Sequence, residues 1–324
     1  MKRPDYWDHT PPPLWTRPLA ALYRLGGALH RRLSTPKKVR VPVISVGNVV
    51  AGGAGKTPSA MLIANTLLKA GMHPHFLSRG YGANVATPTR VSADKHTARD
   101  VGDEPLLLSL TAPCWVYARR SESAVLAVND GADCLVCDDA HQHHALHKDV
   151  RLLVIDGEGG FGNAHVHPAG PLREPLESAL ARADAVLFIG EDVHSILLQI
   201  PLSMPVFHGD IVARNPEIIQ GMGPLVAFAG IARPAKFFKS LRDIGADVIA
   251  EHSFNDHHHF SDTELHRLRD EAESKHAILM TTEKDWVRLP PDMREICNTL
   301  PIELVLNQPD NFYDFLMRHV QHAA

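Results

Sequence analysis

One stretch near the N-terminus, residues 41–71, limits the fold more than any other part of the chain. It begins with an apolar, β-branched run at residues 41–46, whose length and composition are typical of a buried strand. A glycine-rich turn follows, and Lys56 and Thr57 then open a helical pattern that ends at Gly71. This order predicts a phosphate-binding loop, because backbone N–H groups and a helix N-terminus point at the same anion.

The loop predicts a nucleoside triphosphate ligand. Lys56 is expected to reach the β and γ phosphate oxygens, and the Thr57 hydroxyl to hold Mg²⁺. Val50 stands where the usual pattern has its first glycine, so the alternative is a glycine-rich turn that precedes a lysine by chance. The strand before and the helix after oppose that alternative. The predicted nucleotide-binding residues are Val50, Ala51, Gly52, Gly53, Ala54, Gly55, Lys56 and Thr57.

Composition narrows the class of protein. The 324 residues exceed a typical single domain, and 44% hydrophobic with 22% charged residues fits a globular protein. A net charge of -4 gives no basic footprint, so we expect no nucleic-acid partner. Four cysteines and no visible signal peptide favour a reducing cytosol. Cys134 and Cys137 lie in an apolar run and are interpreted as core residues.

The N-terminal region has its own pattern. The sequence holds no run of 18 apolar residues, so no helix need span a bilayer. Residues 14–33 nevertheless combine leucines, Trp15 and Tyr23 with arginines and no acidic residue. Such a basic amphipathic helix can lie in a membrane interface, or it can pack on its own domain, and the two are not exclusive.

Apolar strand patterns recur along the rest of the chain and alternate with helical or loop segments. This alternation predicts a parallel sheet covered on both faces, with ligands at the carboxyl ends of its strands. The predicted strands are residues 75–78, 114–117, 133–137, 150–155 and 185–189, followed by a second set at 225–230, 248–249, 277–280 and 302–306.

The predicted fold is therefore α/β, a P-loop NTPase-type α/β/α sandwich with a second, smaller α/β domain. A boundary is expected near residues 209–224. The expected division is an amphipathic segment at 1–35, a phosphate-binding domain at 36–215 and a second α/β domain with a C-terminal helix at 216–324.

Several charged residues are candidates for chemistry. Asp138 and Asp139 end an apolar strand, where P-loop enzymes keep the carboxylate that completes Mg²⁺ coordination. Asp103 is a candidate general base, although the sequence alone favours the role of a helix N-cap for it. The candidate anchors for an anionic substrate or the transferred phosphoryl group are Arg79, Arg120 and Arg173.

Two histidine clusters invite a metal hypothesis. They follow the aspartates at 139 and 256, and their members are His141, His143, His144, His147, His257, His258 and His259. Their spacing does not match a known metal motif, so solvated or hydrogen-bonded loop histidines are the favoured interpretation.

Taken together, these motifs closely resemble one family, the tetraacyldisaccharide 4'-kinases of lipid A synthesis. That family also lacks the first glycine of the loop, which accounts for Val50. The matching segments are residues 46–58, 77–81, 101–105, 138–139 with 142–143, 168–175, 227–234, 254–258 and 281–285.

The resemblance implies a peripheral enzyme at the cytoplasmic face of the bacterial inner membrane. Its expected reaction uses MgATP to phosphorylate the 4'-hydroxyl of a tetraacylated glucosamine disaccharide 1-phosphate, a glycolipid. Asp103 would be the catalytic base and His257 its partner. The other implied roles are Thr57, Asp139 and Glu174 on the metal side, and Arg79, Tyr81, Arg120, His143 and Arg173 on the substrate.

The chain departs from the family pattern at Ala140 and His141, where the family usually has Gly and Phe. Ala140 argues against a positive φ there, and His141 predicts a more polar loop. The rival function is a P-loop GTPase or ATPase acting as a metal chaperone, in which the histidine clusters would deliver Ni²⁺ or Zn²⁺.

Overall fold

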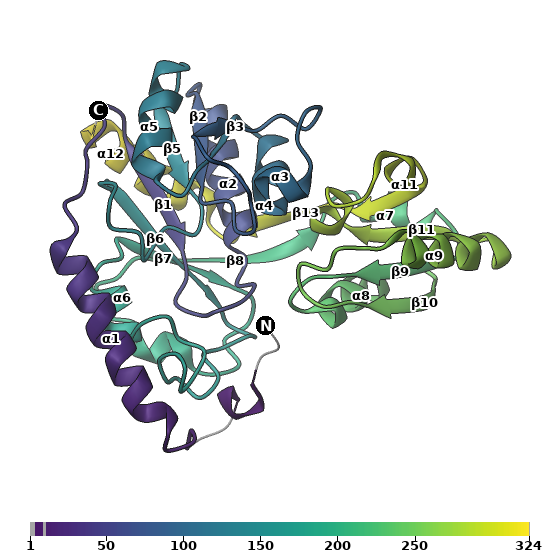
Figure 1. The fold of residues 1–324 in the computed structure, drawn as a ribbon, viewed down its shortest axis with the longest axis horizontal. Helices are drawn as coiled ribbons and strands as arrows, with labels where there is room; N and C mark the ends of the chain where they lie inside the picture. Colours follow the sequence, from purple (N-terminus) through teal and green to yellow (C-terminus); the bar gives the residue numbers. More distant parts are fainter. Residues whose placement is uncertain (1–3, 9–10, 324) are drawn as a thin grey trace.

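The computed structural model describes residues 4–8 and 11–323, which form a larger and a smaller lobe (Figure 1). Within these residues the larger lobe is built on a nine-stranded sheet with the order β13-β8-β7-β6-β1-β5-β2-β4-β3. The edge strands β3 and β13 run antiparallel to their neighbours, and the strands between them are parallel. The bounds are β1 Val43–Gly47, β2 Pro74–Ser78, β3 Thr89–Arg90, β4 Cys114–Val116, β5 Cys134–Cys137, β6 Val150–Asp156, β7 Ala185–Ile189, β8 Val206–Ala213 and β13 Ile302–Leu306.

Helices cover both faces of this sheet, because its strands are apolar on both sides. On one face the side chains of α2 (Lys56–Lys69), α4 (Asp103–Ser109) and α12 (Pro309–Ala323) pack on β1, β2, β5, β6 and β7. On the other face lie α5 (Arg120–Asn129), α6 (Leu176–Leu180) and the short 3₁₀ helix Ile196–Gln199. The α/β/α sandwich predicted from the strand pattern is confirmed.

The smaller lobe repeats the layered arrangement on a smaller scale. Its parallel sheet has the order β10-β9-β11-β12 among the described residues. Its strands are β9 Leu225–Ala229, β10 Val248–Ser253, β11 Ile278–Thr282 and β12 Cys297–Leu300, and its helices are α7 Pro216–Gln220, α8 Pro234–Asp243, α9 Asp262–Ser274, α10 Glu283–Trp286 and α11 Pro291–Ile296. A capping box opens α9, with Ser261 and Glu264 bonding reciprocally.

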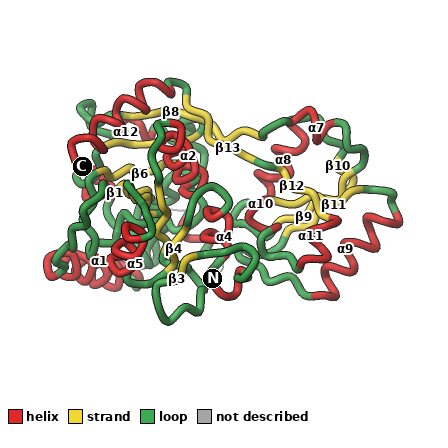
Figure 2. The backbone as a smooth tube through the Cα atoms, turned by 90° about the horizontal axis from the view of Figure 1, so that it is seen from above, coloured by secondary structure: helices red, strands yellow, loops and turns green. Residues whose placement is uncertain are grey.

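The two lobes are joined by two neighbouring segments (Figure 2). The chain leaves the larger sheet after β8 and returns through β13, which pairs with β8 from Ile302–Ala213 to Leu306–Gly209. A backbone hydrogen bond of 2.9 Å from Arg214 to Pro301 continues this pairing between the lobes.

The sheet topology differs from the expected division at two points. Residues 206–213, partly expected as a boundary, form β8, whose polar His208 and Asp210 weaken the strand pattern. The last strand and helix, expected in the second domain, belong to the larger lobe instead, because β8 offers β13 an edge and the apolar face of α12 joins the larger core. The division into domains otherwise remains our proposal.

Helix α1 (Thr16–Leu33) stands on the outside of the larger lobe, beside α6 (Figure 1). Thr16 and Ala20 are its buried residues, whereas Trp15, Leu22, Leu25 and Leu29 are each more than half exposed. In the part of the chain that the structure describes, no helix is both long and apolar enough to cross a membrane.

The position of α12 yields a stability prediction. Phe312 is 1% exposed and packs edge-on against Phe207 with ring centroids 5.1 Å apart. Phe312→Ala should lower the free energy of unfolding by about 3–5 kcal/mol, since it opens a cavity in the larger core. Tyr313→Ala, at a neighbouring residue that is 41% exposed, is the control and should cost far less. Urea unfolding measures both, and equal losses would contradict the packing of α12.

Candidate active site

The predicted phosphate loop lies between β1 and α2, at residues 48–55. Gly52 (φ 135°) and Gly55 (φ 79°) adopt backbone conformations that a residue with a Cβ rarely takes. A Cβ on Gly55 would also come within 2.6 Å of Ile189. The Lys56 ammonium donates to the Gly52 carbonyl at 3.5 Å and lies 3.8 Å from the Asp139 carboxylate. The strand, loop, lysine and helix are thus arranged as a phosphate cradle requires.

A second segment pairs with this loop and explains Val50. Val50 forms an antiparallel bridge with Leu172. The Ala51 amide donates to Pro171 at 2.9 Å, and the Arg173 amide donates to Val49 at 2.7 Å. Position 50 is therefore extended backbone held by a neighbour, and it does not need glycine. The same pairing places Arg173 beside the loop.

The carboxyl end of β5 contributes the next group. Asp139, with φ 47°, accepts a hydrogen bond of 2.7 Å from Arg173. Burial by itself would raise the pKa of Asp139, but Lys56 and Arg173 outweigh it and lower that pKa. Asp138 is 1% exposed, and its Oδ1 has no hydrogen-bond partner among the described residues. Burial, then the charges of Glu104 and Asp139, raise the pKa of Asp138 to about 7.

Arg120 supports this turn from inside. Its side chain is buried, and it donates to the carbonyls of Asp138 at 2.8 Å and Asp139 at 3.1 Å. Neighbouring His143 is partly buried; burial and then the charge of Arg120 lower its pKa to about 3, so the imidazole is neutral. The remaining predicted substrate residues, Arg79 and Tyr81, are exposed on the loop after β2, and the Tyr81 ring centroid lies 5.9 Å from that of His257.

Asp103 and His257 come from different lobes and meet. Asp103 is the first residue of α4, and His257 follows β10 with φ 57°. His257 Nδ1 donates to Asp103 Oδ2 at 2.9 Å, and the other carboxylate oxygen accepts from the Glu104 amide at 2.9 Å. The two residues are 154 positions apart, so their contact is a product of the fold.

The smaller lobe also brings cations that sequence patterns did not single out. Arg288 donates to Asp103 Oδ2 through Nε at 2.8 Å and through Nη2. Lys284 pairs with Glu104 at 3.2 Å. Arg233, at the start of α8, pairs with Asp156 and donates to the Gly53 carbonyl of the phosphate loop at 3.2 Å. The segments 227–234 and 281–285 of the resemblance include Arg233 and Lys284, without assigned roles, whereas Arg288 lies outside both.

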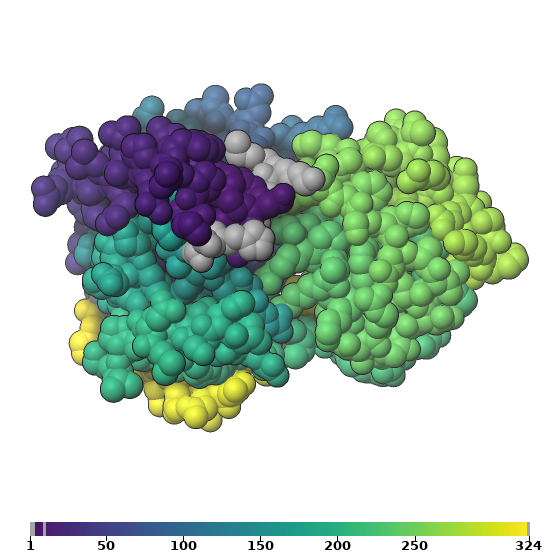
Figure 3. Space-filling model, turned by 90° about the horizontal axis from the view of Figure 1, so that it is seen from below, coloured from purple at the N-terminus to yellow at the C-terminus, as the bar shows by residue number. Residues whose placement is uncertain are grey.

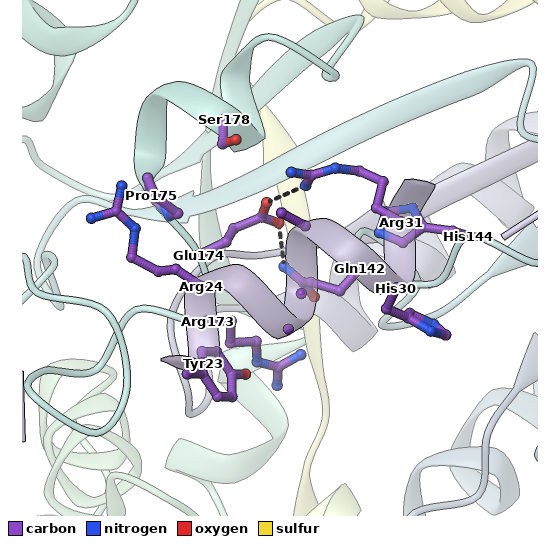
Figure 4. Close-up of a pocket in the computed structure, with 13 residues that line it drawn as sticks. Tyr23, Arg24, His30, Arg31, Gln142, His144, Arg173, Glu174, Pro175 and Ser178 are labelled. Atoms are coloured by element: carbon purple, nitrogen blue, oxygen red, sulfur yellow. Dashed lines mark hydrogen bonds and ion pairs between the residues drawn. The ribbon is translucent and has the colours of Figure 1, made fainter. Parts of the chain in front are cut away.

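A pocket of about 440 Å³ lies between α1 and this site (Figure 4). Arg31 of α1 and Gln142 both reach Glu174, at 3.7 Å and 3.1 Å. Arg182 donates to Glu174 Oε2 at 2.6 Å, the oxygen that Arg31 also approaches, whereas Gln142 donates to Oε1. Glu174 is thus tied to pocket residues, and its expected metal role stays a prediction. The pocket lining includes Tyr23, Arg24, His30, Arg31, His144 and Arg173.

Comparison with known proteins identifies one family. A family model described as tetraacyldisaccharide-1-P 4'-kinase matches residues 13–321. The chain belongs to this family. The tetraacyldisaccharide 4'-kinase of Rhodospirillum centenum is 44% identical over 320 residues, covering 96% of this chain and 94% of the relative. That of Gluconobacter oxydans is 43% identical over 311 residues, covering 92% and 94%.

A solved structure carries the same fold. The crystal structure of the "apo" form of LpxK from Aquifex aeolicus in complex with ATP superimposes with a TM-score of 0.78 at 26% identity. It covers 94% of this chain and 98% of the other.

Membership of the kinase family leaves the metal-chaperone alternative without support. Among the described residues, no group of three or more His, Cys, Asp or Glu side chains could hold a metal ion. His258 instead bonds Glu264 at 3.1 Å and stacks on Phe254. The four cysteines are buried and free, with Cys134 and Cys137 on opposite faces of β5.

The two departures from the family pattern have structural solutions. The left-handed residue of this turn is Asp139, not Ala140, so alanine is accommodated. His141 is 3% exposed, so its polar ring lies inside the fold. Its Nε2 donates to the Ala179 carbonyl at 3.2 Å, and its Nδ1 has no partner among the described residues. Burial lowers the pKa of His141 to about 4.

This buried histidine predicts an acid-sensitive fold. Between about pH 6.5 and 4 the unfolded chain protonates His141 and the folded chain does not, so stability present above pH 6.5 is lost as pH falls. The loss approaches about 3 kcal/mol from this one group. His141→Phe should flatten the pH dependence of the thermal unfolding midpoint across this range. An unaltered slope in His141→Phe would refute this.

Proposed function

We propose that this protein transfers the γ-phosphate of ATP to the 4'-hydroxyl of a tetraacyldisaccharide 1-phosphate, a lipid A precursor. The observation that carries the proposal is the Asp103–His257 hydrogen bond beside a phosphate loop in a chain of this kinase family. The ATP complex of the Aquifex aeolicus relative supports ATP as the phosphoryl donor.

Residues between the phosphate loop and the Asp103–His257 pair connect these two parts of the site. Asp138 is influenced by the charges of both Glu104, next to Asp103, and Lys56 of the phosphate loop. On the smaller lobe, the His257 amide donates to Gly230 at 3.1 Å, and three residues later Arg233 reaches Gly53 of the loop. These contacts support our inference that a hydroxyl held at Asp103 lies on the phosphate side of the loop, as in-line transfer requires.

The proposed step is direct. The 4'-oxygen attacks the γ-phosphorus, the bond from that phosphorus to the β–γ bridging oxygen breaks, and ADP leaves. Asp103 accepts the hydroxyl proton, and His257 orients the carboxylate. Lys56 offsets negative charge on the transferring group.

The carboxylates after β5 suit a magnesium ion. Asp138 Oδ1 is buried without a partner among the described residues, and ionised Asp139 lies beside Lys56. Mg²⁺ is commonly held by one or two protein carboxylates together with phosphate oxygens, so a cluster of three protein ligands is not required. We infer that Asp139 and Thr57 hold the ion, which when bound neutralises phosphate charge.

The pocket beside α1 is our candidate for the disaccharide 1-phosphate. Arg24, Arg31 and Arg173 give it cationic groups that suit a sugar phosphate. Figure 3 presents α1, in purple, on the outer surface of the larger lobe, where its exposed leucines are open to a bilayer. We infer a peripheral protein at the cytoplasmic face of the bacterial inner membrane, with α1 in the interface.

The proposed base predicts a specific kinetic defect. Asp103→Ala should lower kcat by about 10²–10⁴-fold while the KM for ATP stays near the wild-type value, because the carboxylate acts on the hydroxyl and not on the nucleotide. His257→Ala should lose less, and the double variant no more than Asp103→Ala. Asp270→Ala, at an exposed aspartate on α9, is the control. Label transfer from γ-labelled ATP to the lipid is the readout, and an unchanged kcat in Asp103→Ala would remove it from this role.

The membrane role of α1 predicts a separable defect. Leu22 and Leu29 are 64% and 55% exposed and do not line the pocket. The double variant Leu22→Gln/Leu29→Gln should reduce co-sedimentation with liposomes by more than about tenfold, since each leucine loses about 1.5 kcal/mol or more of apolar transfer. Activity on a dispersed short-chain substrate analogue should persist. Ile218→Gln, an exposed position on α7, is the control, and wild-type sedimentation of the double variant would reject the interface.

A further inference from the structure

The carboxylate of Asp103 is held by more than its histidine. Arg288 of the smaller lobe donates to the same Oδ2 through Nε at 2.8 Å and through Nη2. Both side chains are nearly inaccessible, at 3% exposed for Arg288 and 7% for Asp103. Oδ2 is thus shared by Arg288 and His257, whereas Oδ1 accepts from the Glu104 amide.

The other edge of the Arg288 guanidinium is anchored in its own lobe. Nη1 donates to the Gly230 carbonyl at 2.9 Å and to Asp285 Oδ1 at 2.7 Å. Asp285 is fully buried, and its Oδ2 accepts from the Gly230 amide at 2.9 Å. The His257 amide donates to the same Gly230 carbonyl. Arg288 and His257 therefore approach Asp103 from one rigid backbone position.

We propose that Arg288 is a positioning residue for phosphoryl transfer, which fixes Oδ2 of Asp103 and leaves Oδ1 to accept the substrate hydroxyl. This inference rests on the proposed function, in which Asp103 is the base. A carboxylate oxygen has capacity for about two hydrogen bonds, and Oδ1 uses one of them on Glu104. The planar guanidinium suits this task because it holds an oxygen from two directions.

Because Asp103 is buried, it needs the positive charge of Arg288 to stay ionised, in addition to the hydrogen bonds that orient it. Burial by itself would raise the pKa of Asp103; the hydrogen bond from His257 and the charges of Lys284, Arg288 and His257 instead hold that pKa well below its usual range. The titratable and charged groups around Asp103 are His257, Lys284 and Arg288 from the smaller lobe and Glu104 on its own helix, with Asp256 and Asp285 behind them.

The test compares Arg288→Met and Arg288→Lys across pH 5–9. Without the guanidinium the pKa of Asp103 rises, so the acid limb of kcat moves to higher pH, and kcat at pH 7 falls by about tenfold or more while the KM for ATP is kept. Arg288→Lys keeps a cation, so the acid limb of its kcat profile should return to the wild-type pH. Its kcat should stay below the wild-type value, because an ammonium cannot hold Oδ2 from two directions. Since Arg288→Lys retains the buried charge, it carries the test if Arg288→Met does not fold.

A double-mutant cycle separates positioning from a general structural role. In an Asp103→Asn background, Arg288→Met should cost no further activity, because its effect passes through that carboxylate. Arg294→Met, which removes a partly buried arginine over Trp286, is the matched control and should keep the wild-type pH profile. Two outcomes would overturn the inference about Arg288 while leaving the proposed base intact. One is a loss of kcat in Arg288→Met that is the same at every pH and that adds to the loss in Asp103→Asn. The other is a wild-type rate in Arg288→Met. A full rate in Asp103→Asn overturns the proposed base and this inference with it.

Discussion

The arrangement of the site depends on opposite charges that the two lobes bring together. Four carboxylates of the larger lobe face cations of the smaller one; the pairs are Asp103 with Arg288, Glu104 with Lys284, Asp156 with Arg233 and Glu158 with Lys236. The more exposed pairs contribute little free energy on their own. The buried Asp103–Arg288 pair is different, because either partner left alone would be an uncompensated buried charge. It therefore favours one alignment of the lobes over others that would bury equal area.

The phosphate loop illustrates how a tertiary contact replaces a sequence requirement. In the usual pattern the first glycine permits a backbone path that a side chain would obstruct. Here residues 49–51 run alongside 171–173 and are held by two backbone hydrogen bonds and a bridge. Val50 is acceptable because its backbone is extended, and Arg173 reaches Asp139 because the paired segment delivers it there. The pairing of residues 49–51 with 171–173 therefore explains both why no glycine is needed at position 50 and how Arg173 reaches the loop.

The sequence predicted elements whose signals are local. The run at 185–189 coincides with β7, and the loop and helix after β1 followed from their glycines and Lys56. β8 was missed because it is partly exposed and polar, and β13 was given to the wrong lobe because a strand pattern does not name its partner. Arg288 could not be found, since its signal is a contact across 185 residues. The burial of His141 could not be predicted either, because a polar residue type does not indicate which neighbours will cover it.

The contacts of Glu174 connect helix α1 to the phosphate loop. Arg31 of α1 lies 3.7 Å from Glu174, and Gln142 bridges Glu174 to the backbone carbonyl of Asn48, at the start of the loop. A substrate phosphate in the pocket would compete with Glu174 for Arg31, because both are anions. If Arg31 turned to the substrate phosphate, Glu174 would still be bound by Gln142 and Arg182. The charge of Arg182 would then balance that of the Glu174 carboxylate. Helix α1 is therefore in electrostatic contact with the residues that support the loop.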